Sequence, residues 1–356
     1  MIKYAVVGAG WITQEAFLPG VAQSGNSRVE AIVSGNSKKS AALARMYDIP
    51  LAVSYDEYDS LLQSDRIDAV YVALPNSLHA EYAIRAARAG KHVIVEKPLA
   101  NTETEAEAMI AAAKDGGVYL MTAYRLHNEP GTLAVLDRIR SGEIGKPLVF
   151  QSIFSFQAQP DNHRLVAEHW GGPLQDVGVY CINAARHIFS EEPIEATAIS
   201  YRPTDDDRFK EVDATIAATL RFPSGGLAQF VASFGVSSVD AYRVVGSTGN
   251  LELGPGFRHD TPTTLRLRRN GESIKITFPQ VDHLGGHMAY FSDCITSHTP
   301  PEPDGEEGLA DMRVLFAVEE AARTGKPVSI KSSARPRHPT SDMEQRRPVA
   351  PRLLIA

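Results

Sequence analysis

Cysteine and long apolar runs are scarce in this chain. Two cysteines, Cys181 and Cys294, occur among 356 residues, which excludes a small fold held together by many disulfides. One disulfide stays open, but two thiols in a reducing cytoplasm are the simpler interpretation. No run approaches the ~18 apolar residues that a membrane-spanning helix needs. A strand pattern begins at Lys3, so we expect no secretory leader and a cytoplasmic location.

Strong net charge and metal-ligand spacing are also lacking. The formal net charge is -7, and binding to nucleic acid would require a basic face, so we expect no nucleic-acid partner. The eleven histidines are scattered, with no His-Glu-x-x-His motif and no paired Cys/His spacing, so we predict no metal site. What is present is an ordinary composition, 43% apolar and 22% charged. A chain of this length is too long for one core and predicts two domains.

The first third of the chain alternates short apolar runs with helical patterns. The runs predicted as strands are 3–7, 29–33, 69–73, 92–96 and 118–122, and the predicted helices are 13–24, 37–48, 55–64, 77–89 and 103–116. Because the strand runs are continuously apolar and β-branched, they fit a parallel sheet covered on both faces. Ser54 with Glu57, and Thr102 with Glu105, fit the capping box at a helix start. We therefore predict a doubly wound Rossmann domain over residues 1–125.

The pattern changes after residue 125, where longer strands with period-two character appear. Predicted helices are 130–141, 173–189, 286–298 and 305–324, and predicted strands begin at 148 and then cover 194–203, 213–222, 226–235, 241–246, 249–253, 264–269 and 273–278. The turns Pro223-Ser224-Gly225-Gly226 and Asn270-Gly271 indicate hairpins. We therefore predict an α+β domain over 126–331, built on a large, mostly antiparallel open sheet. The tail 332–356 is rich in Pro and Arg, and its composition is typical of disorder.

A glycine turn directly after the first strand indicates a dinucleotide site. Gly8 permits a tight turn, and Gly10 lets backbone amides approach a pyrophosphate at the helix N-terminus. The third fingerprint position is Thr13 rather than Gly or Ala, so a turn without a ligand stays open. Trp11 and Ile12 complete the candidate cofactor contacts at this turn.

The end of the second strand distinguishes between the two nicotinamide cofactors. An NAD site favours Asp or Glu there to bind the ribose 2′-hydroxyl. Here the strand runs into Ser34, Asn36, Lys38 and Lys39, with no carboxylate. A hydroxyl, an amide and a lysine suit a 2′-phosphate, so we predict NADP. One of the two lysines is expected to be only a solvated residue of the helix.

Three further loops follow strands of the predicted parallel sheet, where ligands of such sheets lie. They contribute the candidate cofactor residues Leu74, Asn76, His79, Glu96, Lys97 and Arg125. Asn76 or Ser77 could instead cap the following helix. Lys97, beside Glu96 after a buried strand, could bind a substrate hydroxyl, or form a surface salt bridge. The Lys97–Pro98 bond is a candidate cis peptide.

The second domain offers a helix that carries acid and phenol groups. Asp176, Tyr180 and either Asn183 or Ala184 would share one helix face. Asp176 and Tyr180 could bind a sugar hydroxyl and move its proton, although a buried tyrosine satisfied by Asp176 is the alternative. Gly178 inside this helix would allow a close approach of backbone or cofactor.

Several of these segments together resemble one family, the Gfo/Idh/MocA oxidoreductases, and within it the glucose–fructose oxidoreductases. The resemblance runs from about residue 3 to 330. It rests on the Gly8–Gly10 turn, Glu96-Lys97-Pro98, Tyr124-Arg125, Asp176-x-Gly178-x-Tyr180, Val33-Ser34-Gly35-Asn36, the loops 74–81 and 89–92, Asp207-Arg208-Phe209 and Gly305-Glu306-Glu307-Gly308.

The resemblance implies NADP, with a pyranose oxidised at C1 to a lactone and a second sugar reduced by the same bound cofactor. It implies Lys97 and Tyr180 as the catalytic pair, with Asp176 as the carboxylate on the substrate side. It also implies Ser34 and Lys39 as 2′-phosphate contacts. Arg125 and Trp170 join Lys97, Asp176 and Tyr180 as candidate substrate residues. The open sheet implies a homodimer or homotetramer.

Two departures from the glucose–fructose oxidoreductases keep alternatives open. Those enzymes carry an export leader and an N-terminal arm around the cofactor, which we do not expect here. The stretch 163–170 also lacks their arginine-rich pattern. The alternative enzyme is one with a dissociable cofactor: an aldose 1-dehydrogenase, an anhydrosugar reductase or a dihydrodiol dehydrogenase. The alternative of another class is a non-catalytic NADP-sensing regulator.

Overall fold

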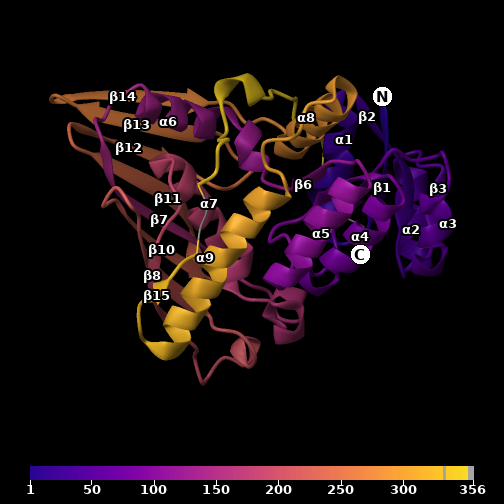
Figure 1. Ribbon diagram of the computed structural model, residues 1–356, viewed down its shortest axis with the longest axis horizontal. Coiled ribbons are helices and arrows are strands. Elements are labelled where there is room, and N and C mark those ends of the chain that lie inside the picture. The colour runs from indigo at the N-terminus through magenta and orange to yellow at the C-terminus, as the bar shows by residue number, and fades with distance from the viewer. Residues whose placement is uncertain (332–333, 352–356) are drawn as a thin grey trace. The chain divides into compact units, whose positions relative to one another are not determined.

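The protein, described here by a computed structural model, divides into two compact units (Figure 1). The structure describes residues 1–331 and 334–351. The first unit comprises Met1–Glu129, Val281–Leu309 and the chain from Met343 on, and the second comprises Pro130–Gln280 and Ala310–Asp342. The sequence-based boundary at residue 125 lies close to the point, after Glu129, where the chain first passes from the first unit into the second. The sequence-based division assigns 281–309 to the second domain, whereas in the structure these residues pack in the first unit.

The first unit is built on a parallel sheet of six strands in the order β3-β2-β1-β4-β5-β6, the order of a Rossmann sheet. The strands are β1 (Ile2–Val7), β2 (Ser27–Val33), β3 (Leu51–Val53), β4 (Ala69–Val72), β5 (His92–Val95) and β6 (Leu120–Thr122). The helices are α1 (Leu18–Ser24), α2 (Ser37–Met46), α3 (Tyr58–Leu62), α4 (His79–Arg88), α5 (Glu103–Asp115) and α8 (His283–Ser297). All five strands predicted for this region are present.

The core of this unit follows from the apolar strand runs. Each residue of β4 is buried, as expected for a strand covered on both faces. Tyr4, Ile32 and Ile94 of the sheet belong to one cluster with Phe17 and Phe291 of the helical layers. The Ser54–Glu57 capping box is present. Thr102 accepts a hydrogen bond from the backbone N–H of Glu105, while the Glu105 carboxylate accepts from Asn101 rather than from Thr102.

The second unit holds a nine-stranded sheet in the order β14-β13-β12-β11-β7-β10-β9-β8-β15. The strands are β7 (Pro147–Gln157), β8 (Glu195–Tyr201), β9 (Thr215–Arg221), β10 (Leu227–Ser233), β11 (Gly235–Gly246), β12 (Gly249–Gly254), β13 (Thr263–Arg269), β14 (Glu272–Phe278) and β15 (Val328–Ser329). The β7–β10 pair is parallel and the other pairs are antiparallel. The predicted fold class, a Rossmann sheet plus a mostly antiparallel open sheet, is confirmed.

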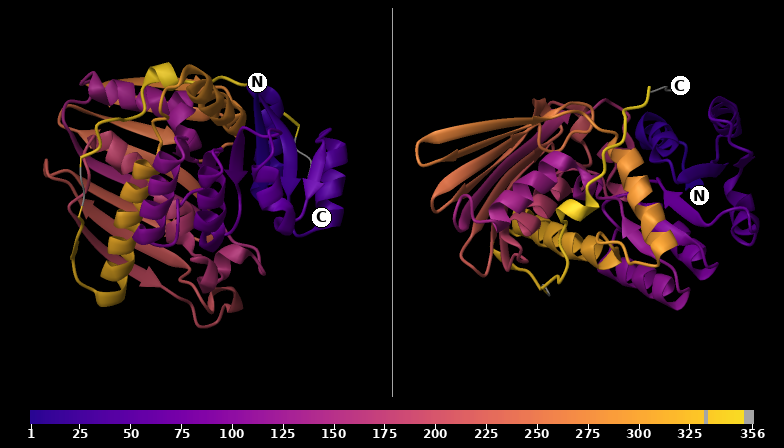
Figure 2. Two further views of the ribbon diagram at one scale, coloured as in Figure 1. Left: turned by 45° about the vertical axis from the view of Figure 1, so that its right-hand side comes forward. Right: turned by 90° about the horizontal axis from the view of Figure 1, so that it is seen from above.

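Helices cover one face of this larger sheet. They are α6 (Pro130–Arg140), α7 (Val179–Phe189) and most of α9 (Gly305–Thr324), and Figures 1 and 2 show them on the same side of the strands. Along β9 the residues Ile216, Ala218 and Leu220 are buried while their neighbours are more exposed, the alternation of a sheet with one packed face. Asn270 and Gly271 both have positive φ, as the predicted two-residue hairpin requires.

Part of the C-terminal tail returns to the first unit. The backbone N–H of Gln345 donates to the carbonyl of Asn128, and the carbonyl of Arg347 accepts from the N–H of Asp282. Met343 and Ala350 are buried. Composition indicated disorder for 332–356, but the described part of that tail is held by hydrogen bonds. Residues 332–333 and 352–356 lie outside the described residues. Among the described residues, no helix combines the length and apolarity needed to cross a membrane.

Candidate active site

The turn after β1 has the geometry of a phosphate cradle. Gly8 has a φ of +103°, and a Cβ at this position would overlap the backbone carbonyl of Ala73, so only glycine fits. A Cβ at Gly10 would meet no protein atom within 4 Å, so this side of the turn is open. The Thr13 hydroxyl donates to the carbonyl of Gly8 over 2.7 Å. Thr13 therefore closes the turn through a hydrogen bond, which accounts for its place in the fingerprint.

The end of β2 presents the predicted 2′-phosphate residues. The hydroxyl of Ser34 accepts a hydrogen bond from the N–H of Asn36 over 3.2 Å. The side chain of Asn36 caps α2 by accepting from the N–H of Lys39 over 3.0 Å. Lys38 is exposed and Lys39 is half-buried. This carboxylate-free set of a hydroxyl, an amide and lysines fits a 2′-phosphate, because each residue can donate a hydrogen bond to it.

The loop after β4 is tied to the loop after β5 through His79. His79 is fully buried, with Nδ1 2.9 Å from the carbonyl oxygen of Pro98 and Nε2 2.9 Å from that of Leu74. Burial lowers the pKa of His79 to about 4, against the raising effect of its hydrogen bonds to backbone carbonyl groups. These contacts assign His79 to holding the two loops together, and its predicted contact with a cofactor stays a prediction. Asn76 and Ser77 lie in the short 3₁₀ turn Asn76–Leu78 that leads into α4, and their assignment to the cofactor or to capping stays a prediction.

Glu96 and Lys97 lie directly beyond β5. The Tyr71 hydroxyl donates to Glu96 Oε1 over 2.5 Å, and the Tyr71 ring stacks on Phe17 with a centroid distance of 4.1 Å. Glu96 is thereby fixed from within the sheet. Lys97 is half-buried, and the Lys97–Pro98 bond is cis. The predicted catalytic lysine therefore lies at the carboxyl edge of the parallel sheet.

Arg125 is the predicted site residue beyond β6. It begins the short 3₁₀ turn Arg125–Asn128 and is 8% exposed. One Nη of its guanidinium lies 3.0 Å from Nδ1 of His283, at the start of α8. Sequence reasoning did not single out His283, because 158 positions separate the two residues.

Tyr180 lies at the start of α7 in the second unit. The tyrosine is 8% exposed, and its ring lies 5.7 Å from that of Phe154 and 6.2 Å from that of Phe257 between centroids. A π-helical turn, Leu174–Gly178, precedes α7; such turns occur frequently at functional sites. A Cβ at Gly178 would lie 3.4 Å from the Cβ of Ala232 on β10. Glycine here thus permits close packing of this segment on the sheet.

Asp176 is held by an arginine from the preceding loop. Arg164 Nε lies 3.0 Å from Asp176 Oδ2, and the two side chains are 25% and 16% exposed. The carbonyl of Arg164 accepts from the N–H of Gly172 over 2.8 Å, so the loop folds back on itself. The Asp176 carboxylate is therefore oriented by a cation while it stays accessible to solvent.

Trp170, a predicted substrate residue, is fixed by a carboxyl group that the sequence did not reveal. The indole Nε1 donates to Glu319 Oε1 over 2.9 Å, and Gln175 donates to the same oxygen. The Trp170 ring stacks on Phe316, with 5.0 Å between centroids. Burial raises the pKa of Glu319 to about 7, against the lowering effect of its two donors. Perturbed carboxyl groups of this kind cluster at functional sites.

Asn183 belongs to a different set of contacts from Asp176 and Tyr180. Its amide donates to Asp311 over 2.9 Å, and Arg186 binds both Asp311 and Glu192. Arg186 is 1% exposed, so this network is internal and anchors α7 to α9. The shared face predicted for Asp176, Tyr180 and Asn183 assumed a regular α-helix, whereas the π-helical turn changes the spacing at this point.

Each unit offers a distinct chemistry. The loops of the first unit supply a glycine turn, a carboxylate-free strand end and the half-buried Lys97, which together fit a phosphate-bearing dinucleotide such as NADP. The second unit supplies an indole, a carboxylate and a phenol within the segment 170–180. Such groups pair with the apolar ring faces and hydroxyls of a small polar ligand.

Comparison with known proteins identifies both units. The family model described as "Oxidoreductase family, NAD-binding Rossmann fold" (GFO_IDH_MocA) matches residues 2–124, and the "GFO/IDH/MocA C-terminal domain" matches residues 132–252. The D-xylose 1-dehydrogenase [NADP(+)] of Haloarcula marismortui is 31% identical, with 92% of this chain and 93% of that protein covered. The 1,5-anhydro-D-fructose reductase of Ensifer adhaerens is 30% identical over 93% of this chain and 99% of its own.

Solved structures agree with these relatives. The aldose-aldose oxidoreductase from Caulobacter crescentus, complexed with glycerol, superimposes with a TM-score of 0.88 at 35% identity, covering 92% of this chain and 99% of that chain. KijD10, a 3-ketoreductase from Actinomadura kijaniata in complex with NADP and TDP-benzene, gives 0.82 at 28% identity, covering 90% and 97%.

Proposed function

The chain belongs to the Gfo/Idh/MocA oxidoreductase family, and from this membership we propose that it is an NADP-dependent oxidoreductase that oxidises C1 of a pyranose aldose to the lactone. The observation that carries the proposal is the segment 170–180, in which Trp170, Asp176 and Tyr180 present an indole, a carboxylate and a phenol. Two relatives carry the name D-xylose 1-dehydrogenase with NADP(+), and the end of β2 has the composition of a 2′-phosphate site.

In the proposed reaction the protein's side chains bind, orient and move one proton. When bound, NADP supplies the hydride acceptor. Tyr180 takes the proton of the C1 hydroxyl as general base, and in the reducing direction it donates that proton. The Lys97 ammonium donates a hydrogen bond to the reacting oxygen, and Asp176 accepts one from a neighbouring sugar hydroxyl. Such positioned proton transfer contributes typically 10²–10⁴-fold to a rate.

We further propose that a second sugar serves as electron acceptor while the cofactor stays bound. The similarity to an aldose-aldose oxidoreductase supports this form of the reaction. The second candidate is a dehydrogenase or reductase that releases its cofactor in each cycle. The names of the xylose dehydrogenase and the anhydrofructose reductase favour that candidate.

One experiment tests the reaction and separates the two candidates. The purified protein is incubated with NADP⁺ and a panel of aldoses, and the reduced-nicotinamide absorbance is followed. The assay is repeated without free NADP⁺ but with a ketose or a second aldose. Turnover in the second assay supports a retained cofactor, and turnover only in the first supports a dissociable one. No turnover in either assay contradicts the proposed function.

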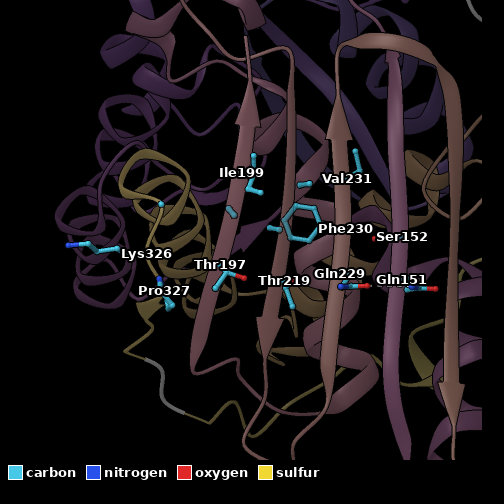
Figure 3. Close-up of a pocket in the computed structure, with 14 residues that line it drawn as sticks. Gln151, Ser152, Thr197, Ile199, Thr219, Gln229, Phe230, Val231, Lys326 and Pro327 are labelled. Atoms are coloured by element: carbon cyan, nitrogen blue, oxygen red, sulfur yellow. Dashed lines mark hydrogen bonds between the residues drawn. The ribbon is translucent and has the colours of Figure 1, made fainter.

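We also propose that a second copy of this chain covers the open face of the larger sheet, giving a homodimer or homotetramer. A hollow of about 620 Å³ on this sheet is lined partly by Gln151, Thr197, Ile199 and Gln229 (Figure 3). Ile199 is 78% exposed and Tyr201 61% exposed, and exposed apolar side chains of this size favour an interface. The mass in solution tests this: a multiple of the chain mass is expected, and Ile199→Glu should lower it. A monomeric wild type contradicts it.

A further inference from the structure

Arg125 and His283 form a buried pair from two distant parts of the first unit. Arg125 begins the 3₁₀ turn after β6, and His283 is the first residue of α8. The distance from Arg125 Nη to His283 Nδ1 is 3.0 Å, and the two residues are 8% and 5% exposed. An arginine side chain has many rotamers, and ordering it costs conformational entropy. A fixed partner inside the protein therefore determines where the guanidinium lies.

The chemistry of the pair determines the state of the imidazole. A guanidinium donates hydrogen bonds and accepts none, so Nδ1 of His283 must be the acceptor and the ring proton must reside on Nε2. His283 also lies at the N-terminus of α8, whose cap is formed by the Asp282 side chain accepting from the N–H of Gly285 over 2.7 Å.

The C-terminal segment 343–347 binds the elements that carry both members of the pair. Asn128, the last residue of the 3₁₀ turn, donates from its side chain to the carbonyl of Met343 over 2.9 Å and accepts at its own carbonyl from Gln345. Asp282, immediately before His283, donates its N–H to the carbonyl of Arg347 over 2.9 Å. One short segment is thus hydrogen-bonded on both sides of the Arg125–His283 pair.

We propose that His283 is a positioning residue for Arg125, and that segment 343–347 is a strap that holds the pair in register at the carboxyl edge of the parallel sheet. The inference rests on the proposed function and on the sequence-based prediction that Arg125 contacts the cofactor or the sugar. It assigns a role in binding to a histidine on α8 and to the C-terminal tail.

The first test measures the imidazole itself and does not depend on turnover. Long-range ¹H–¹⁵N correlation spectra of the full-length protein at neutral pH report the tautomer of each histidine, and His283→Gln assigns the signal. We expect the neutral form with the proton on Nε2. A proton on Nδ1, on either a neutral or a doubly protonated ring, overturns the proposal.

The second test distinguishes the effect of a hydrogen-bond acceptor at position 283 from the effect of side-chain volume. His283→Gln keeps an acceptor and His283→Leu removes it, while His298→Gln changes an exposed residue at the other end of α8. A hydrogen bond to a charged group is worth enough to change binding roughly 10–100-fold. We expect His283→Leu to raise the KM for NADP or sugar at least about 10-fold with kcat nearly unchanged, and His283→Gln and the control to stay close to wild type. If His283→Leu and His283→Gln change KM equally, a role of His283 as hydrogen-bond acceptor is contradicted.

The third test addresses the strap. A chain that ends at Asp342, and the full-length variant Gln345→Pro, which removes the N–H donated to Asn128, should both raise the same KM as His283→Leu. Adding His283→Leu to either should change KM little further, because coupled residues are not additive. Unchanged KM in Gln345→Pro overturns the strap. If wild type oxidises no aldose, the proposed function fails, while the tautomer measurement still decides the inference.

Discussion

The indole of Trp170 donates a hydrogen bond of 2.9 Å to the carboxyl group of Glu319. Trp170 ends a loop that leads into the Asp176 segment, and Glu319 lies on α9. The same carboxyl group accepts from Gln175, so a single half-buried side chain fixes the loop on both sides of its double glycine. Because the pKa of Glu319 is raised, the contribution of this carboxyl group can be measured as a dependence of protein stability on pH.

The stability of the protein should fall as the pH rises from about 4.5 to about 7 through Glu319. Burial raises the Glu319 pKa from 4.5 to about 7, so in this window the native state binds a proton that the unfolded chain has released. The free energy of unfolding therefore decreases with pH, by at most about 3 kcal/mol. Glu319→Gln should remove this component, which denaturant titrations at several pH values would measure.

Glu320→Gln is the matched control for that measurement. Glu320 pairs with Arg323 on the surface and is 45% exposed, so its loss should leave the pH profile close to that of wild type. His79 and His287, whose pKa values are lowered by burial, contribute an opposite slope in every variant. The difference between the wild-type and Glu319→Gln pH profiles therefore gives the contribution of Glu319 alone. If the pH profile of Glu319→Gln runs parallel to that of wild type, the raised pKa of Glu319 is contradicted.

Gly8→Ala and Gly10→Ala should separate folding from cofactor binding. At Gly8 a Cβ would overlap the carbonyl of Ala73 at a φ of +103°, so we expect a loss of more than about 2 kcal/mol in the free energy of unfolding. At Gly10 a Cβ meets no protein atom within 4 Å, so stability should be retained.

Binding of NADP should nevertheless weaken in Gly10→Ala, because the added methyl group lies where the pyrophosphate is expected. We expect at least about a 10-fold rise in Kd, about 1.4 kcal/mol, measured by calorimetry. Unchanged NADP affinity in a stable Gly10→Ala variant would remove the glycine turn from the cofactor site.

Lys39→Ala should weaken NADP and leave NAD unaffected. Loss of one charge on the 2′-phosphate should lower kcat/KM for NADP about 10-fold, the usual scale of a charged hydrogen bond. Lys38→Ala is the control, since Lys38 is the neighbouring lysine, is exposed, and the prediction assigns it no contact. Steady-state kinetics with both cofactors measure the ratio. Equal effects of the two substitutions would show that the lysines act only through general charge.

Tyr180→Phe should lower kcat by about 10²–10⁴-fold while NADP affinity persists, because the proton-transfer group is removed and the ring is kept. Tyr201→Phe removes a hydroxyl from an exposed strand residue and serves as control for the substitution. Near-normal turnover in Tyr180→Phe would refute its assignment as general base.

The order of strands and helices was predictable because each element is indicated by residues that are close together in the sequence. Apolar β-branched runs and capping boxes define the strands and helices of the first unit. β3 was missed because Leu51–Val53 is too short to show a period. α8 was expected to begin at 286, but the side chain of Asp282 starts it at His283 despite Gly285 and Gly286. The π-helical turn before α7 has no sequence signal distinct from an α-helix.

The candidate site was only partly predictable. Gly8, Ser34 and Lys97 could be named because each directly follows a strand of a parallel sheet. The partners that hold Trp170 and Arg125 could not be named, because the pairs are separated by 149 and 158 positions. A single sequence carries no signal for contacts at such distances. The hydrogen bonds of the tail to the first unit were also missed. They join residues far apart in the sequence, and the tail takes part in them through backbone atoms, which carry no residue-specific signal.

The transfer of deuterium from C1 of an aldose to the cofactor is the direct measurement of oxidation at C1. The protein is incubated with NADP⁺ and an aldose deuterated at C1, and the reduced nicotinamide and the sugar product are examined by mass spectrometry and NMR. We expect one deuterium on the reduced nicotinamide and an aldonolactone, or its hydrolysed acid, as product. Reduced cofactor without deuterium, or no reduction with any aldose of the panel, would contradict oxidation at C1.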